Sequence, residues 1–392
     1  MHAYRRSALL GRIEAEPAKT RDAHETNNQP LVRSPSTSSR SDATACKNAS
    51  KAPPSVITAD TAIAQLLESN EPALQLGVQE RVLRVTSGAQ LDPLRSQIPK
   101  SKLAVDLVSE RRNDGKIPRH PYSKWDGAHW VLYSLADLGY PPGDDSLTPL
   151  REQVLDWLLS PGRAQTTARM AEGRARFCAS QEGNAIHYLL MLGLADERID
   201  LLVDRLLESK WPDGGWNCDR TAQADTSSFH ETLLPLRALA LHARLTGSSK
   251  SRQAADRAAE VFLSRSLFRR RRDGAVIHPN FLLLHYPAYW HYDLLAGLKV
   301  MSEFGYVHDE RCSKALDLLE TKQRPDETFP AEVKYWRLGN QKFTGRSLAD
   351  WGSPSKRAGN AFVTLDALAI LRPAGRLKPS VIFNSQFAGP AH

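Results

Sequence analysis

One phrase occurs twice in this chain of 392 residues and limits the folds that the chain can adopt. LLESKWPDGGW, residues 206–216, and LLETKQRPDETF, residues 318–329, share one pattern with a single residue inserted. Looser copies are ERRNDGKIP at 110–118 and FRRRRDGAVI at 268–277. A pattern that recurs in this way is typical of folds that stack copies of one supersecondary unit. The chain is therefore expected to be a repeat protein.

Each copy of the phrase links two helices of different character. Helical periodicity dominates from residue 58 onward, and no convincing strand alternation is present. The helix before each link is amphipathic, whereas the helix after it is more apolar. A helix that is apolar on most sides needs neighbours on most sides, so the second helix of each pair should lie in an inner ring. The sequence predicts an all-α fold, a closed α/α toroid of five outer-inner helix pairs.

The link itself has the residues that a sharp turn between helices requires. Glycine tolerates a positive φ after a helix end, and aspartate can accept hydrogen bonds from neighbouring backbone amides. The predicted outer helices are 101–112, 147–160, 197–210, 251–268 and 309–323. The predicted inner helices are 126–139, 183–195, 227–246, 288–305 and 358–371.

Other segments frame the predicted toroid, which spans 56–372. Residues 1–55 lack a hydrophobic period and have one aromatic residue, which predicts a disordered segment. Residues 60–85 read as two short helices that cap and close the barrel, and 373–392 is interpreted as a C-terminal tail. Residues 337–357 form a long polar loop of the kind that is often functional.

The positive charge is concentrated outside the predicted toroid. The formal net charge is +8, and residues 1–55 carry nine Lys or Arg against five Asp or Glu. Because half of the excess lies in the predicted disordered segment, no nucleic-acid partner is expected. The run Arg269 to Arg272 is interpreted as a solvated face or a basic helix end, with anion binding as the alternative.

Cysteine spacing and hydropathy bear on the compartment. Cys46, Cys178, Cys218 and Cys312 are widely spaced, unlike a disulfide framework. No apolar run approaches the roughly 18 residues of a transmembrane segment, and no apolar stretch of a signal peptide begins the chain. The sequence thus predicts a cytoplasmic protein without a transmembrane segment.

The repeated link resembles the signature of terpenoid cyclases and of protein prenyltransferase β subunits, Gln-x-Pro-Asp-Gly-Gly-Trp/Phe between an outer and an inner helix. Residues 212–216 match it from the proline onward, with Lys210 in place of Gln. The second copy keeps the signature at Gln323, Pro325, Asp326 and Phe329 and replaces Gly-Gly with Glu327 and Thr328.

The resemblance covers about 60–372 and is nearest to short bacterial prenyltransferase and squalene cyclase-like repeat proteins. It implies an α/α toroid that acts on an isoprenoid or another apolar small molecule. Class II cyclases of this family have an Asp-x-Asp-Asp motif whose acid protonates the substrate. This chain lacks the motif, so squalene-type cyclisation is not expected.

Protein prenyltransferases of the family also hold zinc, through Asp-x-Cys before one inner helix and a His before the next. Here Cys218 precedes the third predicted inner helix, and His285 and His291 lie near the fourth. Trp216 stands where the family has its Asp, so Asp219 would have to replace it. The resemblance therefore implies a possible zinc site at Cys218, Asp219, His285 and His291. The alternative is that Cys218 is a buried apolar residue and the histidines bond loop carbonyls.

The predicted inner helices should all begin at one end of the barrel, so their first polar residues could ring a single mouth over an apolar cavity. The residues expected there are Asp126, His129, Gln181, Glu182, Cys218, Asp219, His230, Glu231, His291 and Asp293, of which Asp126, Asp219, His230 and Asp293 are the predicted catalytic residues. The aromatic residues Trp125, Trp130, Tyr133, Phe229, Tyr289, Trp290 and Tyr292 could line the cavity, or could pack between helix pairs.

Three functions follow from this reading. The first is an enzyme that acts on an isoprenoid-like substrate, with or without the assistance of zinc. The second is a binding or scaffold protein that uses the mouth or Arg269 to Arg272 for a partner. The third is a carbohydrate-active α/α barrel, in which Asp126 and Glu182 would be the paired acids.

Overall fold

The computed structural model describes residues 56–163, 170–171, 174–221, 223–339, 341 and 343–378. The predicted disordered segment 1–55 and residues 379–392 of the predicted tail lie outside the described residues. Ile57 pairs with Leu377 through a parallel bridge, so contacts with the start of the toroid extend past the predicted boundary at 372.

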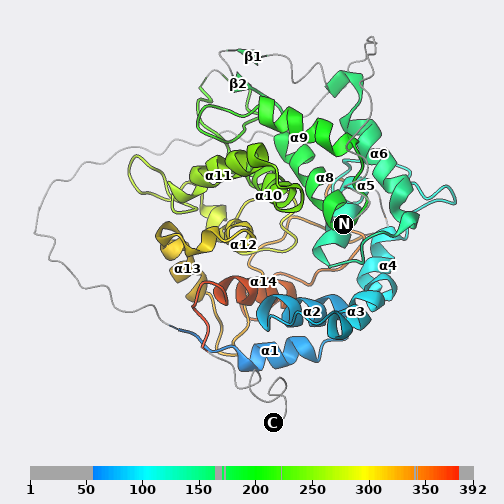
Figure 1. The fold of residues 1–392 in the computed structure, drawn as a ribbon. Coiled ribbons are helices and arrows are strands. Elements are labelled where there is room, and N and C mark those ends of the chain that lie inside the picture. The colour runs from blue at the N-terminus through cyan, green and yellow to red at the C-terminus, as the bar shows by residue number, and fades with distance from the viewer. Residues whose placement is uncertain are drawn as a thin grey trace, which may run out of the picture.

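The described residues form an α/α toroid, as predicted from the repeat (Figure 1). The outer helices are α1 (Asp60–Leu67), α4 (Lys102–Val108), α6 (Thr148–Leu158), α9 (Arg198–Glu208), α11 (Ser249–Leu263) and α13 (Ser313–Glu320). The inner helices are α2 (Pro72–Gly77, continued by a π-helical turn Val78–Val82), α5 (Ala128–Asp137), α8 (Ala179–Met191), α10 (Phe229–Thr246), α12 (Leu294–Glu303) and α14 (Ala361–Leu371). The other elements are helix α3 (Gly88–Gln97), five 3-10 turns (Ile98–Lys100, Asp145–Leu147, Pro279–Leu282, Tyr306–His308 and Glu310–Cys312) and a two-stranded antiparallel hairpin, β1 (Met170–Ala171) with β2 (Arg174–Ala175).

The predicted N-terminal cap closes the ring as a sixth helix pair. Helix α2 and its π-helical turn pack against α14 on one side, as Figure 1 shows. On the other side, Leu76 of α2 lies against Gly139, just after α5. The cap therefore supplies both an outer and an inner helix, which completes a ring that five pairs alone would leave open.

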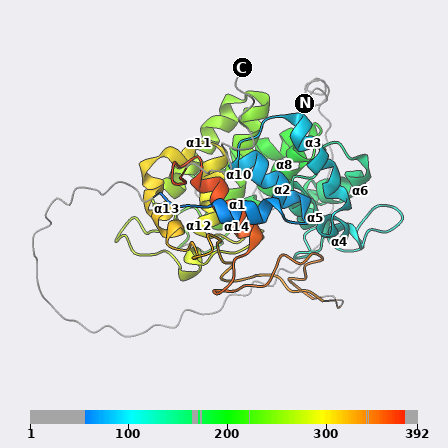
Figure 2. The same ribbon diagram turned by 90° about the horizontal axis from the view of Figure 1, so that it is seen from below.

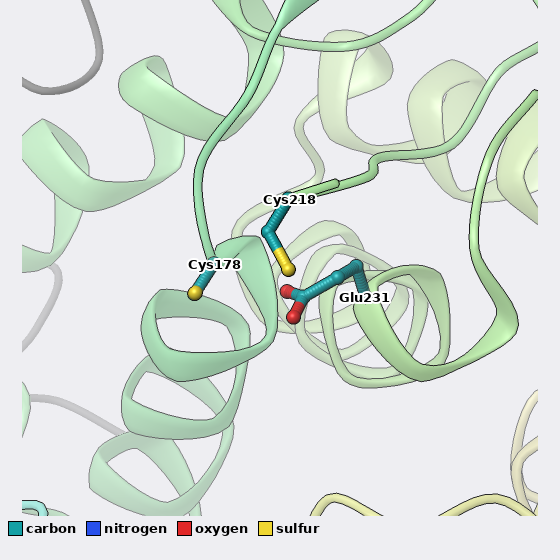
Figure 3. Close-up of side chains that lie close together, drawn as sticks. All are labelled: Cys178, Cys218 and Glu231. Carbon is teal, nitrogen blue, oxygen red and sulfur yellow. The ribbon is translucent and has the colours of Figure 1, made fainter. Parts of the chain in front are cut away.

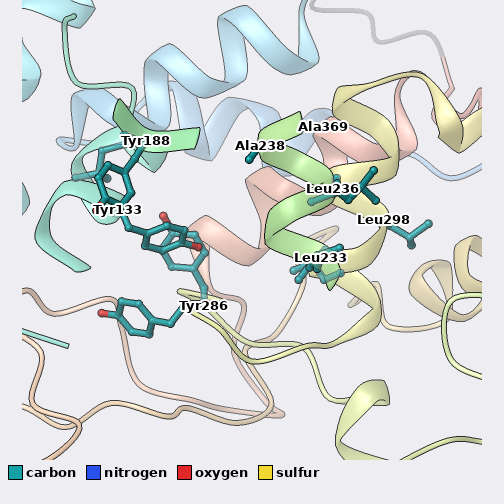
Figure 4. Close-up of a cluster of buried hydrophobic side chains, with 14 of the residues drawn as sticks. Tyr133, Tyr188, Leu233, Leu236, Ala238, Tyr286, Leu298 and Ala369 are labelled. Atoms are coloured by element: carbon teal, nitrogen blue, oxygen red, sulfur yellow. The ribbon is translucent and has the colours of Figure 1, made fainter. Parts of the chain in front are cut away.

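The burial of the two rings differs as the sequence predicts. Nearly every residue of the inner helices α5, α8, α10 and α14 is buried, whereas α9 and α11 bury one face only. Apolar and aromatic side chains from α5, α8, α10, α12 and α14 meet at the centre of the ring, where Figure 4 shows Tyr133, Tyr188, Leu236 and Leu298 among them. The toroid is thus a packed core rather than an open tube.

The four repeated links share one backbone turn. Each link is closed by two backbone hydrogen bonds of its first residue. The amide of that residue donates to the carbonyl of a residue four or five positions later, and its carbonyl accepts from the amide of a residue three or four positions later. These pairs are Arg112 with Lys116 and Gly115, Trp211 with Gly215 and Gly214, Arg270 with Ala275 and Gly274, and Arg324 with Thr328 and Glu327. The residue whose amide donates to the carbonyl of the first residue has a positive φ in all four links, even where it is Glu327. The internal repeat is therefore confirmed as a repeated structure.

The aromatic residue after the turn is held in the same way in the two closest copies. The amide of Trp216 donates to Thr232 Oγ1 at 3.1 Å, and the amide of Phe329 donates to Thr364 Oγ1 at 2.9 Å. Both rings are fully buried. Each aromatic residue thereby joins its link to the first turn of the inner helix that follows.

Replacing Gly214 by alanine should destabilise the protein strongly, because this turn has room for no side chain. Gly214 has a φ of 103°, and a Cβ there would lie 2.5 Å from the carbonyl oxygen of Arg257. Strain and backbone displacement together predict a loss of about 2 to 3 kcal/mol in the free energy of unfolding. Gly143→Ala is the matched control, since Gly143 has a φ of 87° with nothing within 4 Å of its Cβ, and it should cost only about 1 kcal/mol. Equal losses in urea denaturation would contradict this account of the turn.

The fourth inner helix begins later than predicted. The sequence suggested 288–305, with Pro287 in the first helical turn, but α12 begins at Leu294. The side chain of Asp293 accepts a hydrogen bond from the amide of Ala296 at 2.7 Å and caps the helix there. Tyr289 has a φ of 49°, which no helical residue adopts. Residues 285–292 therefore form a loop that folds over the end of the ring.

Candidate functional site

The loops that precede the inner helices gather at one end of the toroid, which we call the mouth. The segment between α13 and α14 runs across this end in Figure 2, where it is drawn in orange. Its Tyr335 carbonyl accepts a hydrogen bond from Trp125 Nε1 at 2.7 Å, and its Gly345 amide donates to the Lys124 carbonyl at 2.7 Å. The long polar loop predicted at 337–357 therefore covers the mouth.

A small cavity lies between the loop 285–292 and the inner helices α5, α10, α12 and α14. Its volume is about 30 Å³, enough for one or two water molecules. Toward the mouth it is lined by His230, His285, His291 and Trp290. Its floor is charged and consists of Asp137, Arg237, Lys299 and Asp366, and its apolar wall includes Leu233, Leu234, Tyr289, Tyr292 and Leu295.

His285 forms a buried pair with the residue that caps α12. Its Nδ1 lies 2.7 Å from Asp293 Oδ2, and its backbone amide donates to the same oxygen at 3.0 Å. Both side chains are almost completely buried. Burial alone would lower the pKa of His285, but the carboxylate of Asp293 outweighs burial and raises it above the ordinary value of 6.5. His285 therefore holds a proton more readily than an ordinary histidine.

His291 has the opposite electrostatic environment. Its ring stacks on Tyr335 at 3.7 Å between centroids and on Trp290 at 4.3 Å. Burial lowers the pKa of His291 far below its ordinary value, and the nearby His285, His230 and Lys124 lower it further. The ring thus stays neutral at physiological pH.

His230 is also a neutral base on the cavity wall. Burial, together with His278 and His285, lowers the pKa of His230 to about 4. Its ring lies 5.5 Å from that of Trp290. Two neutral histidines thus share the cavity with one histidine that holds a proton more readily.

The aromatic residues that the sequence assigned to a cavity divide into two groups. Tyr133, Tyr289, Trp290 and Tyr292 line the cavity. Trp125 stacks on Tyr289 at 4.2 Å between ring centroids with an angle of 2°. Trp130 and Phe229 pack against these rings without lining the cavity. The place of each aromatic residue around the mouth decides whether its ring reaches the cavity, and the sequence alone does not give that place.

Asp126 lies at the mouth but is held by arginines. Its Oδ2 accepts from Arg119 Nη1 at 2.5 Å and from Arg346 Nε at 2.8 Å. Both arginines also contact Glu110. Because Arg346 belongs to the covering segment, this predicted catalytic residue fastens the cover to the start of α5. It does not line the cavity.

The predicted zinc site required Cys218 and Asp219 to lie beside His285 and His291, but in the structure they do not. The side chain of Asp219 is exposed, and its Oδ1 accepts from the amide of Thr221 at 2.9 Å in a local turn. Cys218 faces Cys178 and Glu231 instead, as Figure 3 shows for Cys218 and Glu231. The predicted ligand set thus changes, because the loop before α10 points Cys218 toward α8 rather than toward α12.

Three potential metal ligands meet between α8 and α10. The Sγ atoms of Cys178 and Cys218 and a carboxylate oxygen of Glu231 all lie within 4.8 Å of one another. Cys178 occupies the N-cap position of α8, and Glu231 lies in the first turn of α10. Within the described residues this is the one group of three or more His, Cys, Asp or Glu ligands at such distances.

Other polar residues at the predicted mouth satisfy one another inside the ring. Glu182 accepts from Arg205 at 2.7 Å, and Gln181 accepts from Arg163 at 2.7 Å. His129 is fully buried, with Nε2 at 3.1 Å from Asn184 Nδ2 and Nδ1 at 3.1 Å from Tyr188 Oη. These residues bind α5, α8 and α9 together and leave the cavity to other side chains.

His129 should make the fold sensitive to acid. Burial lowers the pKa of His129 from 6.5 to about 3, so below pH 6.5 the unfolded chain binds a proton that the folded protein does not. Near pH 5 this difference costs about 2 kcal/mol of unfolding free energy relative to neutral pH. The variant His129→Gln cannot titrate and should lose about 2 kcal/mol less between pH 7 and pH 5 in denaturant titrations. An equal loss of unfolding free energy between pH 7 and pH 5 in the two proteins would refute the assignment of this acid sensitivity to His129.

The charged floor of the cavity is a feature that the sequence analysis missed. Lys299 Nζ lies 2.8 Å from Asp137 and 3.0 Å from Asp366, and Arg81 lies 2.6 Å from Asp366. Arg237 lies 3.6 Å from Asp137 and 2.6 Å from Glu303. The sequence did contain an indication of this charged floor, because each of these inner helices has a charged residue within an otherwise apolar run.

The solved structures that are similar to this chain have low sequence identity and low TM-scores. No protein-family model and no curated protein matches the chain. A GH76 alpha-mannanase from Bacteroides thetaiotaomicron is 11% identical over 82% of this chain and 86% of its own, with a TM-score of 0.38. A glycosyl hydrolase family 88 protein from Bacteroides vulgatus is 11% identical over 81% and 91%, with a TM-score of 0.40. A type II terpene cyclase from Scytonema, in complex with geranylgeranyl dihydroxybenzoate, is 14% identical over 81% of this chain and 96% of its own, with a TM-score of 0.37.

Among the described helices, none is both long and apolar enough to cross a membrane.

Proposed function

We propose that the protein is an enzyme that moves a proton to and from an apolar substrate at the mouth of the toroid. One observation carries the proposal: His285 and His291 line the same cavity, and their pKa values are displaced in opposite directions. Titratable neighbours whose environments separate their pKa values are the usual sign of an acid and a base assigned to different roles. His285 is the proton donor and His291 the proton acceptor.

The spacing of the two rings suits this pair of roles. Their centroids are 6.0 Å apart at an angle of 86°, about twice a hydrogen-bond length. A substrate group between them could therefore approach both rings. Asp293 lies 2.7 Å from Nδ1 of His285 and stabilises a positive charge on that ring, which makes Asp293 a positioning residue.

The surroundings favour a substrate with an apolar or flat group. Trp290, His291 and Tyr335 form a stack of rings at the mouth, and Leu233, Leu234 and Leu295 form the wall below. Lys124 lies over the Trp290 ring at 4.8 Å, and burial lowers the pKa of its amine. An isoprenoid is the substrate class that the repeat suggests. Because the cavity of about 30 Å³ holds only one or two water molecules, only one small group of such a substrate, such as a methyl or hydroxyl, would enter it, while the remainder of the chain lies outside the ring.

The predicted catalytic residues have different roles in this proposal. His230 and Asp293 belong to the cavity or to its immediate support. Asp126 holds the cover, and Asp219 stands in an exposed turn. Asp126 and Glu182, the acids considered for glycosidic chemistry, are both paired with arginines.

Turnover in D₂O tests the proposal. The purified protein is incubated in D₂O with a panel of isoprenoid alcohols and diphosphates and with aryl glycosides, and products are analysed by mass spectrometry. We expect an isoprenoid to be converted with deuterium at carbon, and the signal to be lost in His285→Asn and His291→Asn. His308→Asn, on the exposed surface, is the control. Conversion of a glycoside without deuterium at carbon would instead assign a carbohydrate-active enzyme.

A binding or scaffold protein is the second candidate, favoured by the packed ring with its water-sized cavity. Such a protein would bind a ligand at the mouth without converting it. Isoprenoid binding detected by native mass spectrometry, together with no product in the D₂O assay, would assign this role.

A further inference from the structure

The thiols of Cys178 and Cys218 and the carboxylate of Glu231 form a cluster that the acid-base site does not use. Each residue comes from a different part of the chain: the loop before α8, the loop after Trp216 and the first turn of α10. Both cysteines are partly exposed and Glu231 is buried, so the cluster can be reached from solvent on one side only. No disulfide joins the two thiols, which are both free.

The surrounding backbone holds the three side chains in place. The Ser180 amide donates to Glu231 Oε2 at 2.9 Å and holds the carboxylate in place beside Cys218. A bridge between Arg176 and Asn217 brings the two cysteine loops side by side. The guanidinium of Arg176 binds the carbonyl oxygens of Thr221 at 2.8 Å and Ala224 at 3.0 Å. Outer contacts of this kind orient the ligands in metal sites.

We propose that Cys178, Cys218 and Glu231 bind one zinc ion. Zinc accepts two thiolates together with a carboxylate, whereas calcium and magnesium take oxygen ligands and do not prefer the thiolates. Ligands about 2.3 Å from zinc lie about 3.8 Å apart in a tetrahedron, so a largest separation of 4.8 Å requires a closure of about 1 Å. Small changes of side-chain rotamer supply that closure.

The fourth position of the zinc ion would be open. Within the described part of the chain, no fourth His, Cys, Asp or Glu joins the cluster. Three protein ligands with a free position are the arrangement of catalytic rather than structural zinc sites. A water molecule or an oxygen atom of a small molecule at the mouth would complete the tetrahedron.

The charge around the cluster fits a site of this composition. Two thiolates, one carboxylate and Zn²⁺ sum to a single negative charge. Lys124 and Arg163 both lie close enough to Cys178 to interact with it electrostatically, and they offset that charge. Lys124 also interacts with His291, so the zinc site and the histidine pair lie at the same mouth. The zinc site does not depend on the proposed acid-base reaction.

Metal content and spectroscopy of the full-length protein test the proposal. The protein is purified under reducing conditions without chelator, and zinc is measured per chain by elemental mass spectrometry. Cobalt is then exchanged for zinc, because thiolate ligands give Co²⁺ an intense near-ultraviolet charge-transfer band. Variants Cys178→Ser, Cys218→Ser and Glu231→Gln are compared with Asp219→Asn and His291→Asn, which test the ligand set that the sequence suggested, and with Cys312→Ser. Circular dichroism confirms that each variant is folded.

We expect one zinc per chain in the wild type and at least a hundredfold weaker binding, by chelator competition, in the three cluster variants. The Asp219, His291 and Cys312 variants should keep wild-type affinity. Retention of zinc by folded cluster variants, or a reduced wild type that takes up neither zinc nor cobalt, would overturn the proposal. A Cys178–Cys218 disulfide in the isolated protein would also overturn it if reduction did not restore zinc binding. If the variants fail to fold, the charge-transfer band of the wild type decides, since its absence excludes thiolate ligation.

Discussion

Replacing Asp137 by asparagine is expected to lower the free energy of unfolding by about 3 to 5 kcal/mol. The Asp137 carboxylate is 4% exposed, accepts from Tyr286 Oη at 3.0 Å and lies 2.8 Å from Lys299. Despite burial, Lys299 and Arg237 hold its pKa well below the usual range, so it is charged throughout the physiological range. Without that charge, two cations about nine-tenths buried lose a counterion in the middle of the ring.

Urea denaturation of Asp137→Asn and of the double variant Asp137→Asn/Lys299→Met measures this effect. The double variant should regain part of the loss, because it removes the one positive charge left in excess when Arg81, Arg237 and Lys299 share only Asp366 and Glu303. Asp92→Asn is the control, since the Asp92 side chain is 70% exposed beside Arg95 and its loss should cost less than about 1 kcal/mol. A loss for Asp137→Asn no larger than that of the control would show that the charged floor does not stabilise the ring.

Replacing His285 by asparagine is expected to lower turnover of the substrate identified in D₂O by about 10²- to 10⁴-fold, the usual contribution of general acid catalysis. Asparagine can keep a hydrogen bond to Asp293 but cannot donate a proton to substrate. In the wild type, turnover should fall as pH rises through the raised pKa of His285, because the donor is then deprotonated. No corresponding loss is expected between pH 7 and pH 5, since His291 stays neutral there.

Asp293→Asn separates positioning from proton transfer. Asparagine retains an oxygen for the amide of Ala296 and therefore still caps α12, but it removes the charge that raises the pKa of His285. The alkaline limb of the pH profile should then move to lower pH, with a smaller loss of turnover than in His285→Asn. An unchanged profile would show that Asp293 serves the helix end alone.

The repeat determined much of what the sequence could predict about the fold. Asp-Gly turns and the aromatic residue after them depend on local chemistry, so the links, the two rings and the closed toroid were predictable from residues 206–216 and 318–329. The start of α12 was not, because Pro287 favours the first turn of a helix in general. In this chain the Asp293 cap and the positive φ of Tyr289 place the helix start later.

The candidate site was predictable in its residue types but not in its partners. His291, Asp293 and Cys218 were expected at the mouth and His285 in the zinc site, and both histidines line the cavity. Spacing along the chain does not fix the direction of a loop side chain, so Cys218 was assigned to the histidines of the next repeat. The sequence analysis named Cys178 only as one of four widely spaced cysteines, because a single sequence does not indicate which cysteines lie side by side in the fold.

The protonation states of His285 and His291 test the central claim most directly, and no substrate is needed. Ring carbon and proton shifts of isotopically labelled histidines are followed by NMR across the pH range, with His285→Asn and His291→Asn spectra to assign the signals. The account predicts that His285 titrates above 6.5 and that His291 stays neutral far below it. Two histidines that both titrate near 6.5 would contradict the assignment of an acid and a base.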